Sequence, residues 1–153
     1  MGADMERGSS PHAPSLEERA FLALLRTADR LQGKIAAWLK PHGLSPTQYN
    51  ALRILRGAGL AGLPSTEVGA RMISRDSDIT RLMDRLEKRR LVTRSRGKKD
   101  RRVVRASITA AGFKLLRSLD RPAAEFVRGM MGGLGNERLQ GMLELLEKVS
   151  ARD

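Results

Sequence analysis

The sequence contains no cysteine, few aromatic residues and no long apolar segment. The absence of cysteine excludes disulfides, thiol redox switches and cysteine-ligated zinc sites. Because Phe, Trp and Tyr make up only 3% of the 153 residues, the core must consist mainly of Leu, Ile, Val, Met and Ala, which favours helices packed on helices. No apolar run approaches the roughly 18 residues of a membrane span, and no secretory signal is evident. We therefore expect a cytoplasmic protein.

Groups for catalysis and metal binding are also scarce. The only histidines are His12 and His42, and without any cysteine they argue against a metal-sensing site. There is no nucleophile elbow, no glycine-rich phosphate loop and no pair of carboxylates in a periodic context. The sequence thus predicts neither an enzyme nor a bound cofactor.

Positive charge is what the sequence has in excess. Its 29 Lys and Arg residues against 17 Asp and Glu residues give a formal net charge of +12, which indicates a polyanionic partner, either nucleic acid or an anionic membrane face. Between Arg75 and Arg105, 13 basic residues stand against five acidic ones, a net of +8. A generally basic, solvated surface would not concentrate charge in this way, and a membrane-surface protein would carry it along one amphipathic helix. Nucleic acid is the favoured partner.

The first 42 residues divide into a tail and a helix. Residues 1–14 combine Gly, Ser, Pro and mixed charge without periodicity, and we interpret them as a disordered tail. Ser15 and the two acids that follow form a helix start, because a capping side chain precedes negative charge at the positive end of the helix dipole. Apolar residues then recur at three- and four-residue steps until Pro41. The segment 15–42 offers no partner for this helix, which predicts a role in dimerisation.

The next segment carries the pattern of a helix-turn-helix. Pro46 suits the first position of a helix, a loop is expected over 60–64, and Ser65 is expected to cap a short helix over 66–72. A further amphipathic helix should begin near Asp76. Its expected buried stripe is Ile79, Leu82, Met83 and Leu86. A short helix, a tight turn and a second amphipathic helix are typical of the helix-turn-helix.

A β-hairpin, or wing, is expected directly after this motif. The chain runs out from Val92, turns at Gly97-Lys98-Lys99-Asp100 and returns with β-branched residues at alternate positions. The side chains expected to face inward on the return strand are Val104, Ala106 and Ile108.

The remainder of the chain is helical in pattern. Thr109 caps a fifth helix, which should bend at Pro122, and a glycine cluster over 132–135 separates it from a last helix. We assign 43–112 to a winged helix-turn-helix lobe that binds DNA and 113–153 to C-terminal dimerisation helices. The predicted fold class is mainly α with a small β-hairpin.

The basic residues coincide with the helix and hairpin that would lie against DNA. In the first turn of that helix, the residues that could reach base edges in a major groove are Ser77, Asp78, Thr80 and Arg81, of which Arg best matches guanine O6 and N7. Arg85, Lys88 and Arg89 lie further along and would meet phosphates, which fixes register without reading sequence. The wing residues expected to follow the backbone towards a narrow minor groove are Arg96, Lys98, Lys99, Arg101 and Arg102. Alternatively, Arg85 pairs with an acid on its own helix, and Lys98 and Lys99 are merely solvated.

The sequence resembles the MarR family of bacterial transcription regulators from Gly43 to Leu116. The matching segments are GLSPTQYNALRIL, STEVGARM, DITRLMDRLEKRRLV, the DRR of the wing and SITAAGFKLL. The resemblance implies a triangular homodimer formed by the first, fifth and sixth helices, a palindromic operator and often a ligand that weakens DNA binding. It also implies that Arg102 enters the minor groove while Asp100 orients the wing tip.

Two positions depart from the family pattern. Arg90 stands where a glycine usually follows the recognition helix, and Ser77 stands where proline is common. A left-handed Arg costs about 1 kcal/mol relative to Gly. Neither departure threatens the fold.

The predicted function is a sequence-specific regulator, a repressor that binds double-stranded DNA as a homodimer; the alternative is a nonspecific or architectural DNA-binding protein. A ligand pocket is a further hypothesis, with the candidate lining residues Trp38, His42, Tyr49, Arg53 and Phe113. Aromatic rings with one guanidinium would suit a planar anion such as a phenolic acid. The alternative is that the aromatic residues belong to the core and that His42 is an exposed helix-end residue.

Overall fold

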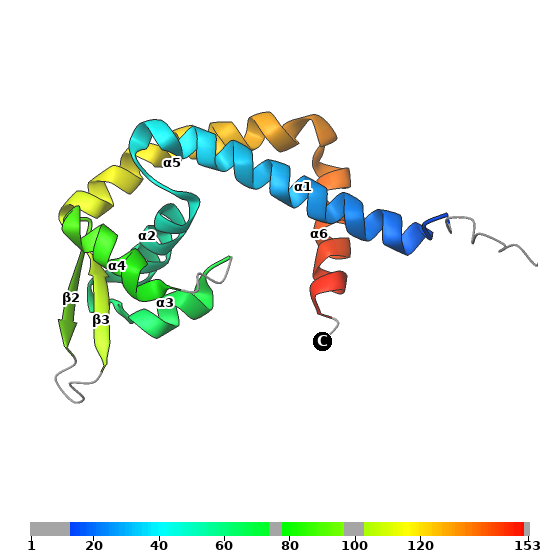
Figure 1. Cartoon of the computed structure of the whole chain (residues 1–153). Helices are drawn as coiled ribbons and strands as arrows, with labels where there is room; N and C mark the ends of the chain where they lie inside the picture. The colour runs from blue at the N-terminus through cyan, green and yellow to red at the C-terminus, as the bar shows by residue number, and fades with distance from the viewer. Residues whose placement is uncertain (1–12, 74–77, 97–102, 152–153) are drawn as a thin grey trace, which may run out of the picture. The chain divides into compact units, whose positions relative to one another are not determined.

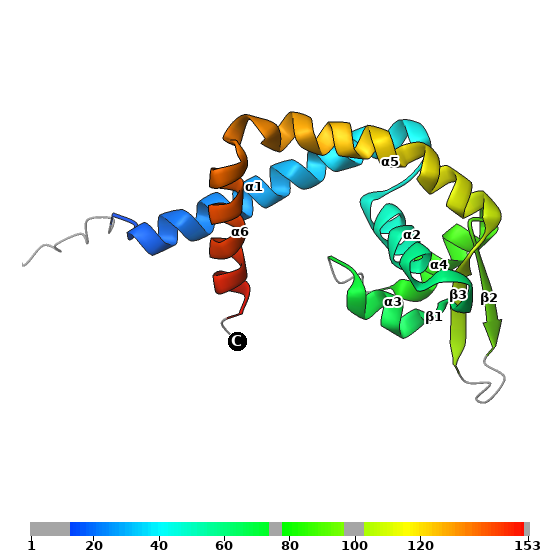
Figure 2. The ribbon, with the colours of Figure 1, turned by 180° about the vertical axis from the view of Figure 1, so that it is seen from behind.

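The computed structural model describes residues 13–73, 78–96 and 103–151. The chain forms two compact units, Met1–Pro46 and Thr47–Asp153. Figures 1 and 2 show the ribbon from two opposite sides. Most of the predicted tail lies outside the described residues, and the assignment of terminal segments to dimerisation stays a prediction.

The first unit consists of α1 (Leu16–Leu39) and the 3-10 helix η1 (Lys40–His42). Ser15 caps α1, which confirms the prediction: Ser15 Oγ accepts from the Glu18 N–H at 3.1 Å, and the Ser15 N–H donates to Glu18 Oε2 at 2.8 Å. This reciprocal capping box satisfies two N–H groups that lack intrahelical partners. Leu39 is fully buried, whereas every described residue before Leu31 is exposed. Most of α1 therefore contributes nothing to a core within its own unit.

The core of the second unit lies among three helices and a small sheet. The helices are α2 (Pro46–Ala58), α3 (Ser65–Arg71) and α4 (Ile79–Lys88), and α3 with α4 forms the predicted helix-turn-helix. In both views they are grouped beside the hairpin (Figures 1 and 2). The fully buried aliphatic side chains of these helices are Ala51, Leu52, Leu55, Val68, Met83 and Leu86. Their spacing gives α2 and α4 one apolar face each.

Two predicted helix starts are wrong. Ser65 is the first residue of α3 and not its cap; the cap position is Pro64, without a side-chain hydrogen bond, and Ser65 Oγ donates to the Val104 carbonyl at 3.4 Å. Helix α4 begins at Ile79 with Asp78 as its cap, later than the predicted start near Asp76, which lies outside the described residues. Because Asp is a good cap at either position, the residue types alone could not decide between Asp76 and Asp78.

The sheet has three antiparallel strands and not only the two of the predicted hairpin. Strands β2 (Val92–Arg96) and β3 (Val104–Ile108) pair with Val92 opposite Ile108, and the order is β1-β3-β2. The additional strand β1 (Leu63–Pro64) pairs with β3, in a segment predicted to be loop; the loop itself contains the 3-10 helix η2 (Gly59–Ala61). A strand of two residues is too short to show an alternating pattern, so the sequence did not reveal β1. Its pairing with β3 requires Gly62, where a Cβ would lie 2.2 Å from the Ala106 carbonyl oxygen.

The inward-facing residues of β3 are only partly those predicted. Ala106 is fully buried and Ile108 is half-buried, but Val104 is 37% exposed. The prediction for Val104 is wrong because this end of β3 extends past the helices. The alternating pattern of side chains continues there, but no helix covers the Val104 side chain. The hairpin thus projects from the core (Figure 1).

Two further helices complete the second unit. Helix α5 (Ala110–Met131) continues through Pro122, the 3-10 helix η3 (Gly132–Leu134) follows, and α6 (Asn136–Ser150) ends the described chain. Thr109 caps α5 as predicted, since its Oγ accepts from the Gly112 N–H at 3.1 Å. None of the helices in the described ranges combines the length and apolar character needed to span a membrane.

The turn after α4 confirms the predicted left-handed residue. Arg90 has φ 57° and is the sole non-glycine residue with positive φ among those described. The Arg90 N–H donates to the Glu87 carbonyl at 2.8 Å and the Leu91 N–H to the Leu86 carbonyl at 3.0 Å. These two bonds define a Schellman motif, whose left-handed position favours glycine. Thr109 Oγ donates to the Arg90 carbonyl at 2.7 Å, which ties the turn to the start of α5.

Candidate nucleic-acid interface

Helix α4 presents a polar, cationic face opposite its buried stripe. Leu82, Met83 and Leu86 are buried at 3% exposure or less. This burial directs the remaining side chains outward, and the exposed ones are Thr80, Arg81, Arg85 and Lys88. The helix can therefore carry four polar or cationic side chains to a ligand without disturbing the core.

The first turn of α4 is organised by Asp78. Its carboxylate accepts from the Arg81 N–H at 2.9 Å and lies 3.2 Å from Arg81 Nε. The Arg81 side chain remains 76% exposed, so this ion pair is weak and can exchange for another partner. Asp78 serves as helix cap, a role beyond the predicted base contact. Ser77 lies outside the described residues.

Arg85 and Lys88 continue the exposed face. Among the described residues neither forms an ion pair within 4.0 Å, so the alternative that Arg85 pairs with an acid on its own helix gains no support. Both are exposed, as is Arg89, the C-cap residue. Their contact with phosphates stays a prediction.

The hairpin contributes one described cation near its outer end. Arg96, the last residue of β2, is exposed and sits on the strand that follows α4 in the chain. The other wing residues named from the sequence lie outside the described residues, namely Lys98, Lys99, Asp100, Arg101 and Arg102. Their roles stay predictions.

Two arginines of the basic segment are engaged by the protein itself. Arg105 Nη2 donates to the Gly62 carbonyl at 2.8 Å and to the Ala61 carbonyl at 3.1 Å. Arg94 lies 2.6 Å from carboxylate oxygens of both Asp84 and Glu87. The sequence predicted both arginines only as part of the basic segment, because the carboxylates and carbonyls that bind them are brought close by folding and leave no signal in the local composition. The side-chain hydrogen bond with Glu87 is the main reason that the pKa of Arg94 is raised above its ordinary value.

The candidate ligand residues fall into separate groups. Trp38 and His42, in the first unit, have ring centroids 5.7 Å apart. In the second unit the Arg53 guanidinium carbon lies 5.8 Å from the Tyr49 ring centroid, and both residues line a cavity of about 740 Å³ between α2, α5 and α6. Phe113 is 47% exposed and lines a different hollow, so it is not part of this cavity wall.

The cavity wall contains a cross-helix ion pair. Arg56 Nη1 of α2 donates to both carboxylate oxygens of Asp120 in α5, at 2.9 and 3.0 Å. Arg128 also lines the cavity, together with apolar Val127 and Leu139. Cations beside an apolar wall could hold an organic anion. Of these cations, the sequence analysis named Arg53 but not Arg56 or Arg128.

Comparisons with known proteins agree with this architecture. The model of the MarR family matches residues 44–104. The uncharacterized HTH-type transcriptional regulator YpoP of Bacillus subtilis is 31% identical over 113 residues, covering 71% of this chain and 76% of YpoP.

Solved structures match as well. A MarR transcription factor from Planctomyces limnophilus is 36% identical, with 89% of this chain and 98% of that one covered and a TM-score of 0.68. MepR of S. aureus, crystallised with DNA, shares the fold at 20% identity, with 86% and 96% coverage and a TM-score of 0.76. The chain belongs to the MarR family of DNA-binding, winged helix-turn-helix transcription regulators.

Proposed function

We propose that this chain recognises a specific double-stranded operator, with α4 in a major groove and the β2–β3 hairpin along the adjacent backbone. The observation that carries the proposal is the exposed face of α4, where Arg81, Arg85 and Lys88 lie opposite a fully apolar buried face. A helix of this kind fits the major groove, and a hairpin beside it extends the contact.

Different residues would carry affinity and specificity. Arg81 stands in the first turn of α4 and its guanidinium matches a guanine edge, so it would read a base. Arg85 and Lys88 lie one and two turns later, where phosphate contacts fix the register. The predicted entry of Arg102 into the minor groove would add shape-dependent affinity.

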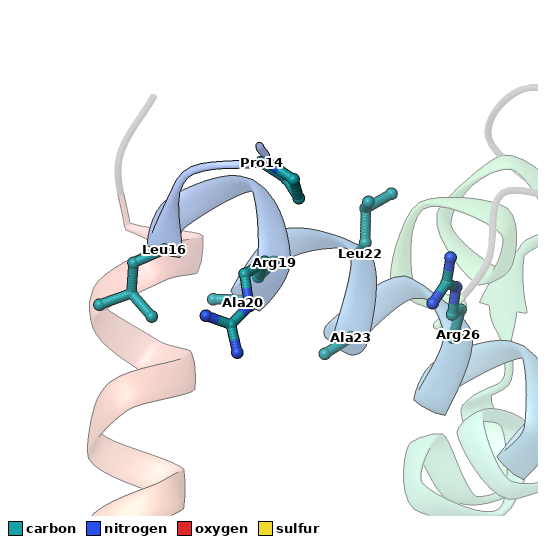
Figure 3. A pocket seen from close by; sticks show the side chains of 7 residues that line it. All are labelled: Pro14, Leu16, Arg19, Ala20, Leu22, Ala23 and Arg26. Atoms are coloured by element: carbon teal, nitrogen blue, oxygen red, sulfur yellow. The ribbon is translucent and has the colours of Figure 1, made fainter. Parts of the chain in front are cut away.

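A homodimer is the second part of the proposal. Large apolar side chains of α1 are exposed, and a shallow hollow lined by Leu16, Leu22 and Ala23 runs along its N-terminal turns (Figure 3). Other exposed large apolar residues of α1, α5 and α6 are Phe21, Leu24, Leu25, Phe113, Val127, Leu143, Leu145, Leu146 and Val149. A monomeric protein rarely leaves so much apolar surface in water. A second copy would cover these faces, and its two-fold symmetry would call for a palindromic operator.

Sedimentation tests the dimer. The wild-type chain should sediment as a dimer, and Leu25→Glu should shift it towards monomer because the substitution places a charge on a face that would be buried. Leu60→Glu is the matched control: Leu60 is 96% exposed and lies in η2, outside all three terminal helices, so this variant should remain dimeric. A wild-type chain that sediments as a folded monomer would refute this part.

Selection from a random duplex pool tests specific recognition. The retained DNA should share one palindromic site, and the purified protein should bind it roughly 10³-fold or more tightly than random duplex at fixed salt. Equal affinity for both would support the alternative of an architectural protein. A dimer bound at a promoter would exclude polymerase, so we propose repression, which a promoter-reporter assay tests.

A small-molecule effector is a second candidate activity, favoured by the cavity that Tyr49, Arg53 and Arg128 line. An aromatic carboxylate could stack on the Tyr49 ring and pair with a guanidinium. With salicylate as probe, calorimetry should detect binding that Arg53→Leu weakens. The same probe should lower the affinity for the selected operator. No heat from wild-type protein at millimolar salicylate would count against this ligand class.

A further inference from the structure

Arg94 connects the hairpin to α4 through two carboxylates. Its Nε and Nη2 atoms donate to Glu87 Oε2 at 2.9 and 2.6 Å, and Nη2 lies 2.6 Å from Asp84 Oδ1. The Arg94 backbone N–H donates to the other oxygen of the same carboxylate, Glu87 Oε1, at 3.1 Å. Glu87 thus holds both the main chain and the side chain of one residue of β2.

Arg94 is the least exposed member of this cluster, since the side chains of Asp84 and Glu87 are 44% and 38% exposed. The Arg94 side chain is only 23% exposed, and charge-assisted hydrogen bonds to a planar guanidinium fix its orientation as well as its position. An ammonium group could not reproduce this fork. Together with the Schellman turn at Arg90, the contact joins α4 to β2.

The charge of the cluster also needs an explanation. Asp84 and Glu87 place two negative charges against one positive charge on a helix whose exposed face is cationic. Carboxylates near phosphates oppose DNA binding by like-charge repulsion. A gain in affinity from a fixed position of the hairpin relative to α4 would offset that repulsion.

We propose that Arg94 is a positioning residue that sets the orientation of the hairpin relative to α4, and that it makes no phosphate contact of its own. Asp84 and Glu87 hold it in place. This inference rests on the proposed function, in which α4 and the hairpin touch one duplex together. If the hairpin direction is set by this cluster, loss of any member should displace the hairpin from the backbone that it follows.

The salt dependence of binding separates this role from a direct contact. The dissociation constant for the selected operator is measured over a series of KCl concentrations, for wild type, Arg94→Gln and the matched control Arg96→Gln. Arg96 lies two residues further along the same strand and is exposed. Loss of a phosphate contact reduces the salt slope by about one per bound subunit. We expect Arg94→Gln to weaken binding about tenfold and to reduce the slope by clearly more than one per bound subunit, because a displaced hairpin loses several phosphate contacts at once, whereas Arg96→Gln should reduce it by about one.

Substitution of the acidic residues of the cluster tests the direction of the change in operator affinity. Removing a negative charge from a DNA-binding surface should by itself strengthen binding, whereas loss of a positioning contact weakens it. Glu87→Gln is therefore expected to weaken operator binding about fivefold or more, and Arg94→Lys should not restore wild-type affinity. Because the joint register of α4 and the hairpin matters most in the cognate complex, the ratio of operator to random-duplex affinity should fall in each variant. A mere loss of folded protein would leave that ratio unchanged.

Several results would overturn the inference. A slope that falls by only about one in Arg94→Gln, as it does in Arg96→Gln, would make Arg94 a single phosphate contact. Tighter binding by Glu87→Gln, or an unchanged operator-to-random ratio in all variants, would show that the cluster does not position the hairpin. Failure of wild-type protein to prefer any duplex would instead refute the proposed function.

Discussion

Replacing Arg90 by glycine should stabilise the protein, although it removes a large side chain. Arg90 holds a left-handed backbone with φ 57°, the centre of the left-handed region. The two hydrogen bonds of the Schellman motif and the bond from Thr109 all use backbone atoms of this turn, so glycine preserves them. The Arg90 side chain is exposed, and no ion pair of it is found within the described residues.

The magnitude follows from two opposing terms. A left-handed conformation costs a non-glycine residue about 1–2 kcal/mol. Glycine, however, loses more backbone entropy on folding, about 0.5–1 kcal/mol. The net gain in unfolding free energy should be about 0.5–1 kcal/mol, which for a chain of this size corresponds to an increase in Tm of about 1–4 °C.

Urea unfolding followed by circular dichroism, at one protein concentration for all variants, measures this difference. Lys88→Gly is the control: Lys88 is the last residue of α4 with ordinary helical geometry, so glycine there should destabilise by up to about 1 kcal/mol. Opposite signs at two positions two residues apart would confirm that backbone conformation decides the effect. If Arg90→Gly is neutral or as destabilising as Lys88→Gly, the reasoning is refuted.

Three other substitutions have expected outcomes. Gly112→Ala should destabilise by about 1–3 kcal/mol in urea unfolding, because a Cβ there would lie 2.3 Å from the Leu91 carbonyl oxygen; wild-type stability would contradict the close approach. Thr109→Ala should cost about 1 kcal/mol by loss of the α5 cap, measured in the same way, with Ala111→Ser at an exposed position as control. Arg81→Ala should cost about 1–3 kcal/mol of operator affinity and relax base preference at one position, whereas an unchanged sequence profile from repeated selection would remove Arg81 from base recognition.

Features that depend on near neighbours in the chain were predictable from the sequence. The capping box at Ser15 and the Thr109 cap each involve residues within three positions of one another, so their chemistry is visible in the sequence. The same holds for the exposed face of α4, because the buried stripe at Leu82, Met83 and Leu86 fixes the opposite face. The left-handed Arg90 is predicted from the resemblance to the family, which usually has glycine at this position, and not from its own residue type.

Choices among equivalent local signals needed the folded structure. Asp76 and Asp78 are equally good caps by residue type, and only the observed acceptance of the Arg81 N–H at 2.9 Å identifies Asp78. The alternation that placed Val104 inward was regular, but a regular pattern does not say where the covering helices end.

What the sequence by itself determined is the order of elements, the helix ends marked by local chemistry and the location of the positive charge in the segment of the reading helix and hairpin. What only the tertiary structure decided is which charges are available. Arg94 and Arg105 contribute to the basic count, yet folding brings carboxylates of α4 to Arg94 and the carbonyls of Ala61 and Gly62 to Arg105. The net charge is a sum over the residues and does not depend on structure. The formation of an ion pair or hydrogen bond depends on the distance between two groups, which folding sets for residues that are separated in the sequence.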